Sequence, residues 1–161
     1  GFWDTTSDWT RWADGAYEVN GGSPWFYKGW YKSRTGKTCG RSHPWLNTTE
    51  FADIVNAVIV VANNGDTSGI FPEDARTCWG DNDTAWSRDR LAQEADKHGG
   101  QVTSINSVRV DHGSNGKTSR VVIGTNRGEV NVSGEAFYKG YNLRAMGALA
   151  LKSYLFNIEK K

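Results

Sequence analysis

The chain has 161 residues, with 19 Lys and Arg against 18 Asp and Glu, which gives a formal net charge of +1. Because the charges are balanced and no long basic stripe is present, the sequence argues against nonspecific electrostatic binding to nucleic acid. Apolar residues make up 37% of the chain and aromatic residues 12%, which is enough for a packed core and too much for a disordered segment. No apolar run approaches the about 18 residues that a membrane-spanning helix needs, so we expect no membrane span.

The length is typical of one domain. We expect residues 1–161 to form a single domain or a domain fragment with three segments: a Trp- and Gly-rich segment 1–46, a helical segment 47–100 and a β-rich segment 101–161. The first residue is Gly and the only Met is Met146, so we expect the chain to be an excised or processed piece of a longer protein.

The two cysteines, Cys39 and Cys78, leave two interpretations open. Two cysteines in an extracellular domain commonly pair, whereas a cytosolic protein keeps both reduced. Cys39, His43 and Cys78 with a second His would make a set of zinc ligands, but the C-x2-C pair typical of such sites is not found. We therefore expect a disulfide or free thiols, and neither a metal nor another cofactor.

The first segment is rich in aromatic residues and shows no helical period. It predicts an irregular segment with short strands, for example over residues 25–31. Tyr and Trp rings in such a segment either form a local core or stack on the apolar faces of sugar rings while their polar tips stay in water. The candidate glycan-binding residues are Trp25, Tyr27, Trp30, Tyr31 and Trp45.

Two helices are predicted in the second segment. Asn47 followed by Glu50 is a capping box, and the apolar residues from Phe51 to Ile59 repeat at helical spacing until Asn63-Asn64-Gly65 ends the helix. Ser87 begins a second, more polar helix, which ends at Gly99-Gly100 and should lie on the surface of the core.

From Val102 the apolar residues alternate with polar ones, which predicts strands. Turn residues at 114–117 and 126–128 separate three such strands. Ser133 then precedes a short helix that carries Phe137 and Tyr141, and residues 153–158 alternate again. The expected fold class is α+β, with an antiparallel sheet formed mainly by the C-terminal half and two or three packed helices.

The acidic and histidine residues have structural explanations. Glu50 and Asp53 lie one helical turn apart, as a pair of catalytic carboxyls would, but Glu50 already has a capping role. Asp111 and His112 are neighbours on a strand, so their side chains should point to opposite faces as a surface pair. His98 lies near a helix C-terminus, where a His suits the helix dipole.

The last third of the chain resembles a known family. Ser133-Gly134-Glu135-Ala136-Phe137, the pair Leu143-Arg144 and the closing residues 153–158 are similar to the C-terminal part of the stage II sporulation protein D family, also called the LytB amidase-enhancer family. His43-Pro44-Trp45-Leu46 before a capped helix also looks like the family's pattern. The resemblance covers roughly residues 40–161, and it implies a closing strand at the C-terminus.

The resemblance implies action on peptidoglycan. Sporulation members of the family are lytic transglycosylases, which cleave the glycan without water and use one carboxyl as acid and base. The family's catalytic Glu lies in a Pro-x-x-Trp-x-x-Glu-Ala-Leu-Lys-Ala-Gln-Ala type stretch, which this sequence does not contain. The catalytic residues are therefore left unassigned.

The resulting expectation is the distal, scaffold-forming part of a secreted lytic-transglycosylase-like protein, outside the cell or in a bacterial cell envelope. Its expected partners are peptidoglycan glycan strands, together with the upstream part of the same protein or a cell-wall amidase. The alternative is a non-catalytic module that binds a carbohydrate or a protein through exposed aromatic residues.

Overall fold

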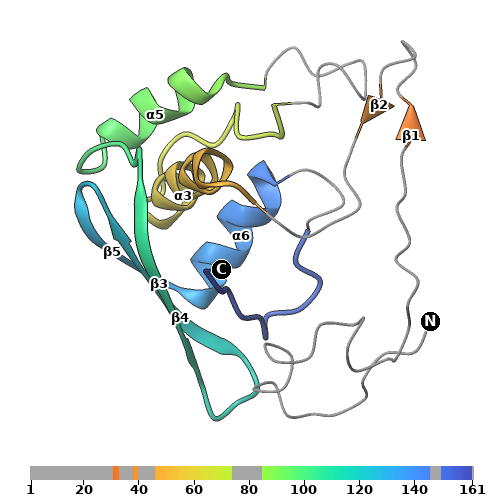
Figure 1. Cartoon of the computed structure of the whole chain (residues 1–161), viewed down its shortest axis with the longest axis vertical. Coiled ribbons are helices and arrows are strands. Elements are labelled where there is room, and N and C mark those ends of the chain that lie inside the picture. Colours follow the sequence, from red (N-terminus) through yellow and green to blue (C-terminus); the bar gives the residue numbers. More distant parts are fainter. Residues whose placement is uncertain (1–30, 33–37, 40–45, 74–84, 146–149, 161) are drawn as a thin grey trace.

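The structure is a computed structural model that describes residues 31–32, 38–39, 46–73, 85–145 and 150–160. In this part of the chain, three helices pack with a three-stranded antiparallel sheet, which confirms the predicted α+β class (Figure 1). Two short strands, β1 (Tyr31–Lys32) and β2 (Thr38–Cys39), pair antiparallel with each other near the beginning of the chain. The rest of residues 25–31, for which strands were predicted, lies outside the described residues.

The central element is the helix α3 (Thr48–Ala62). Its first turn carries the predicted capping box: Glu50 N donates to Asn47 Oδ1 at 2.9 Å, and Asn47 N donates to Glu50 Oε1 at 3.1 Å. Asn63 caps the other end, and Gly65 N donates back to Val60 O at 2.8 Å. The predicted helix therefore begins and ends where its capping residues indicate.

The sheet has the order β3-β4-β5 and consists of β3 (Ile105–His112), β4 (Thr118–Thr125) and β5 (Gly128–Ser133). Val121 and Ile123 of β4 pair with Val132 and Val130 of β5, and these four side chains are buried. Arg120 and Val122, the neighbours of Val121 in sequence, point to the other face, where Arg120 is exposed and Val122 is buried. One face of the sheet is therefore apolar and the other largely polar, as the alternation predicted.

The helices α3 and α6 (Gly134–Arg144) pack against each other and against the sheet (Figure 1). Ser133 caps α6, and Phe137 in its second turn is fully buried between the rings of Tyr141 and Phe156, at centroid distances of 5.8 and 5.5 Å. The short helix predicted after Ser133 is confirmed and extends to Arg144. Aromatic stacking in the core thus joins α6 to the C-terminal segment.

The third helix, α5 (Arg88–Asp96), packs on α3 through Leu91 and Ala95, which are fully buried. Ser87 is its N-cap, and its side chain accepts a hydrogen bond from Arg90 N at 3.2 Å. Most other side chains of α5 are polar, so the helix lies at the surface of the core as predicted.

Two details differ from the sequence prediction. Strand β3 begins at Ile105 and not at Val102, because the side chain of Asn56 on α3 bonds both Val102 N and Val102 O, at 2.8 and 3.0 Å. These two bonds occupy the backbone groups that a strand at Val102 would offer to a neighbouring strand.

The expected closing strand over residues 153–158 is wrong. No strand is assigned in the described residues 150–160, and Tyr154 is exposed whereas Phe156 is buried. Both sides of β4 are already paired, with β3 and β5, so the contacts of the C-terminal segment with β4 are made at Thr118, where this strand begins. Thr118 N donates to Tyr154 O, and Thr118 Oγ1 lies 3.0 Å from Phe156 N and 2.9 Å from Phe156 O.

We predict that Gly140→Ala destabilises the fold. A Cβ at Gly140 would lie 2.6 Å from Val58 Cα, so α3 and α6 would have to move apart. Overpacking costs about 1–3 kcal/mol, and we expect the upper part of this range because the clash is with backbone. Such a cost exceeds the about 1 kcal/mol that Ala gains over Gly in a helix. Urea unfolding followed by circular dichroism measures the loss. Lys139→Ala on the exposed side of α6 is the control, and equal midpoints for the two variants would contradict the close contact.

Candidate functional site

The aromatic residues predicted to bind glycan fall largely outside the described part of the structure. Trp25, Tyr27, Trp30 and Trp45 lie outside it, and for Tyr31 the structure describes only its backbone in β1. Their role in binding stays a prediction.

The predicted pairing of the two cysteines also involves residues outside the described part of the structure. Cys39 pairs with Tyr31 in the β1–β2 ladder, and Cys78 lies outside the described residues, so the disulfide stays a prediction. The described residues contain no group of three His, Cys, Asp or Glu side chains that could hold a metal ion.

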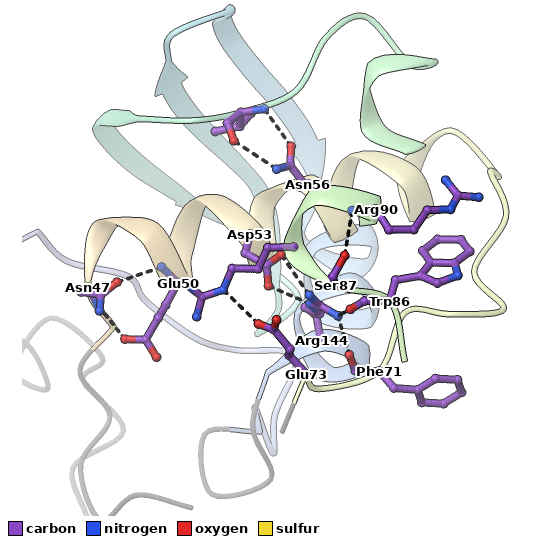
Figure 2. Close-up of polar contacts among 12 residues, drawn as sticks. Asn47, Glu50, Asp53, Asn56, Phe71, Glu73, Trp86, Ser87, Arg90 and Arg144 are labelled. Carbon is purple, nitrogen blue, oxygen red and sulfur yellow. Dashed lines mark hydrogen bonds and ion pairs between the residues drawn. The ribbon is translucent and has the colours of Figure 1, made fainter. Parts of the chain in front are cut away.

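Asp53, the second acid of the predicted carboxyl pair, is held by Arg144 at the end of α6 (Figure 2). Arg144 Nε donates to Asp53 Oδ2 at 2.7 Å, and Nη2 donates to Oδ1 at 3.1 Å. The exposed fractions of the two side chains are 1% for Arg144 and 11% for Asp53. This is a bidentate ion pair almost free of solvent, the strongest type of carboxylate contact.

The remaining donors of Arg144 reach two backbone carbonyls. Nη1 donates to Phe71 O at 2.7 Å and to Trp86 O at 2.8 Å (Figure 2). One guanidinium therefore joins α3, α6 and the two segments that flank residues 74–84. Sequence analysis found Arg144 only as part of a family pattern and did not link it to Asp53, which lies 91 positions away.

Trp86 forms a second contact in the same region. Arg90 Cζ lies 4.7 Å from the centroid of the Trp86 ring, within cation–π distance. Gly69 lies so close to the indole that a Cβ there would overlap the ring. Trp86 N also donates to Gly69 O at 2.9 Å. The half-buried indole thus holds the start of α5 against the loop that follows α3.

The other carboxylates with a basic partner are also engaged. Glu94, which is 5% exposed, accepts from Lys97 Nζ at 2.7 Å and from Arg90 Nη1 at 3.1 Å. Asp111 accepts from Arg120 Nη2 at 2.7 Å and from Arg109 Nε at 3.2 Å. These carboxylates therefore serve as ion-pair partners on α5 and on the polar face of the sheet.

These contacts lower the pKa of the acids. Hydrogen bonds from Lys97 and then Arg90 lower the pKa of Glu94 although its burial acts in the opposite direction, and hydrogen bonding to Arg120 lowers that of Asp111. Hydrogen bonds from Ser68 and from Lys139 do the same for the pKa values of Asp66 and Glu135. Each shift favours the ionised form of the acid.

His112 contacts the C-terminal segment: its Nε2 lies 2.9 Å from Phe156 O. The carboxylate of its neighbour Asp111 bonds arginines of the polar sheet face. The structural role of this pair stays a prediction.

Among the described residues, Tyr154 is the one large hydrophobic side chain that is exposed, with an exposed fraction of 40%. Its ring stacks on Tyr138 of α6 at a centroid distance of 4.2 Å, and Lys117 Nζ lies 5.6 Å from its centroid. We call Tyr138, Tyr154 and Lys117 the tyrosine patch. It combines an aromatic surface with a positive charge, a pattern that suits a ligand with an apolar face and an acidic group.

Sequence analysis missed the tyrosine patch. Tyr154 was placed on the same face as Phe156 by its alternation, and its partners Tyr138 and Lys117 come from a different helix and a hairpin turn. Only the packing of the C-terminal segment on Thr118 brings the three together.

Comparison of the chain with protein-family models, with curated proteins and with solved structures gives no match in any of the three. The resemblance to the stage II sporulation protein D family therefore stays a prediction from the sequence. In the described part of the chain, no helix has the length and apolar character required to cross a membrane.

We predict that Asp53→Asn destabilises the protein by about 3 kcal/mol, because it leaves the guanidinium of Arg144 buried without its negative partner. Chemical unfolding measures this effect. The control is Glu129→Gln, at an exposed position on β5. It removes one carboxylate but leaves no buried charge without its partner, so it should change stability little. A loss for Asp53→Asn no larger than that of this control would contradict the structural role of the ion pair.

The lowered pKa of Glu94 predicts a pH dependence of stability. In the unfolded protein, Glu94 has the ordinary pKa of a glutamate, 4.5, and binds its proton more tightly than in the folded protein. The stabilisation by ionised Glu94 is therefore complete above that pH and is lost as the pH falls through the folded pKa. We expect the wild type to exceed Glu94→Gln in stability at neutral pH, and the difference to shrink below pH 4.5. Unfolding midpoints measured across this range check it, and a difference that does not change with pH would contradict it.

Proposed function

We propose that this chain is a peptidoglycan-associated domain that binds glycan strands and forms a scaffold, without supplying the catalytic carboxyl. In this proposal it is the distal part of a secreted or cell-envelope protein of a bacterium. The upstream part of that protein, or a cell-wall amidase, would perform the cleavage.

The observation that carries the proposed absence of catalysis is that six carboxylates of the described residues already accept hydrogen bonds: Glu50, Asp53, Asp66, Glu94, Asp111 and Glu135. Glycan cleavage needs a carboxyl that keeps its proton near neutral pH, which requires a raised pKa. The pKa values of Asp66, Glu94, Asp111 and Glu135 are instead lowered by their hydrogen-bond donors. Glu50 caps a helix and Asp53 is bound by Arg144, so neither offers a free carboxyl to a substrate.

Three features support the proposed binding to glycan strands. The resemblance of residues 107–158 to a peptidoglycan-cleaving family points to this polymer. The aromatic residues of the first segment supply candidate stacking surfaces. The tyrosine patch adds a described one, where a sugar ring can pack on Tyr154 while Lys117 attracts the carboxylates of the stem peptides.

The alternative, a module that binds another carbohydrate or a protein through exposed aromatic residues, draws on the same patch. Aromatic side chains at the surface are also typical anchors of protein interfaces. The two proposals differ in the ligand, so a set of purified ligands separates them.

We predict that the protein co-sediments with purified peptidoglycan sacculi and that Tyr154→Ala weakens this binding roughly tenfold, a loss of about 1.4 kcal/mol. The measurement is a sedimentation assay over a range of sacculus concentrations. Asn131→Ala, at an exposed position of β5 on the polar sheet face, is the control and should bind like the wild type. Wild-type protein that stays in the supernatant would contradict the association with peptidoglycan.

The same incubation tests the proposal that this chain does not supply the catalytic carboxyl. Soluble products are analysed by liquid chromatography and mass spectrometry for anhydro-muropeptides. We expect none above the level of a sample without protein. Their formation by the purified chain would contradict the proposal, because a catalytic carboxyl would then have to lie within these residues.

A further inference from the structure

The turn between β3 and β4 contains an Asn-Gly pair in an exposed position. Ser114, Asn115 and Gly116 form its tip, and Gly113 N donates to Lys117 O at 2.8 Å across its base. Gly116 has a φ of 74°, a left-handed conformation, and no atom lies within 4 Å of where its Cβ would be. The tip is therefore open to water and offers little steric hindrance next to Asn115.

The geometry of the turn also activates the side chain of Asn115. Its Oδ1 accepts a hydrogen bond from Lys117 N at 3.2 Å. If a nucleophile attacks the amide carbon, negative charge develops on this oxygen, and a backbone N–H already directed at it stabilises that charge. The nucleophile next to it is the backbone nitrogen of Gly116, and among the described residues no acceptor is bonded to its N–H.

We infer that Asn115 is a site of spontaneous deamidation. Gly116 N loses its proton to solvent and forms a bond to Asn115 Cγ, and the side-chain amide leaves as ammonia after taking up a proton. The product is a five-membered succinimide. Water then adds to one of its two carbonyls and breaks one C–N bond, which yields aspartate or isoaspartate at this position.

Within the described part of the chain, a second Asn-Gly pair, Asn64-Gly65, provides an internal comparison. Here Gly65 N already donates to Val60 O at 2.8 Å, as part of the end of α3, and a Cβ at Gly65 would lie 2.5 Å from His98 Nε2. Attack by Gly65 N first requires this hydrogen bond to break and the helix end to open, which costs free energy. The same dipeptide is therefore protected at one place in the fold and reactive at the other.

Deamidation changes the surface of the protein. It lowers the formal net charge from +1 to zero and places a carboxylate two residues before Lys117, which belongs to the tyrosine patch. Isoaspartate also adds one methylene to the backbone of the turn. The product is thus distinguishable from the original protein both by charge and by the form of its backbone.

The test is incubation of the folded protein at mildly alkaline pH, followed by peptide mapping with mass spectrometry and by enzymatic methylation of isoaspartate. We expect Asn115 to be converted roughly tenfold faster than Asn64, because breaking one hydrogen bond and opening the helix end both precede reaction at Asn64. Equal rates at the two sites in the folded protein, or conversion of Asn64 alone, would overturn the inference.

Two controls separate the effect of the fold from that of the local sequence. In concentrated urea the rates at Asn115 and Asn64 should converge, because the Gly65 hydrogen bond is gone, and a tenfold difference that persists there would overturn the structural explanation. Asn115→Gln should remove the reaction at the turn, since its cyclisation needs a less favourable six-membered ring. Circular dichroism verifies that this variant is folded.

Discussion

A single buried guanidinium holds together the parts of this protein that the core alone does not join. Arg144 ends α6, and it bonds the Asp53 carboxylate of α3 as well as the carbonyls of Phe71 and Trp86. A charge that is 1% exposed is tolerated only when its donors are satisfied, so these four contacts depend on one another. They set the position of the end of α6 relative to α3, Phe71 and Trp86.

The apolar core explains why these partners meet. Val55 and Val58 of α3 are fully buried, and Gly140 lets α6 approach the backbone of α3 closely. These small and β-branched residues allow α3 and α6 to pack closely. Phe137 extends the same core to Phe156 in the C-terminal segment. The polar contacts of Arg144 and Asn56 then fix segments without regular secondary structure, at Phe71, Trp86 and Val102.

The chemistry available to the described residues follows from this arrangement. Asp53, Glu94 and Asp111 form ion pairs with basic side chains, and hydrogen bonds from Lys97 and from Arg120 lower the pKa values of Glu94 and Asp111. A carboxyl with a lowered pKa is ionised at neutral pH and has no proton to deliver to a leaving group. Recognition through aromatic surfaces is compatible with the arrangement, because the stacking of Tyr138 and Tyr154 leaves part of a ring open to solvent.

Local signals in the sequence determined the elements: the capping box at Asn47, the N-caps Ser87 and Ser133, and the alternation that separates the two faces of the sheet. Such signals act over three or four residues, so they are readable without a fold. The partner of Arg144, the late start of β3 and the path of residues 153–158 were decided only by tertiary structure. Each depends on groups distant in sequence, whose meeting is set by packing and not by spacing along the chain.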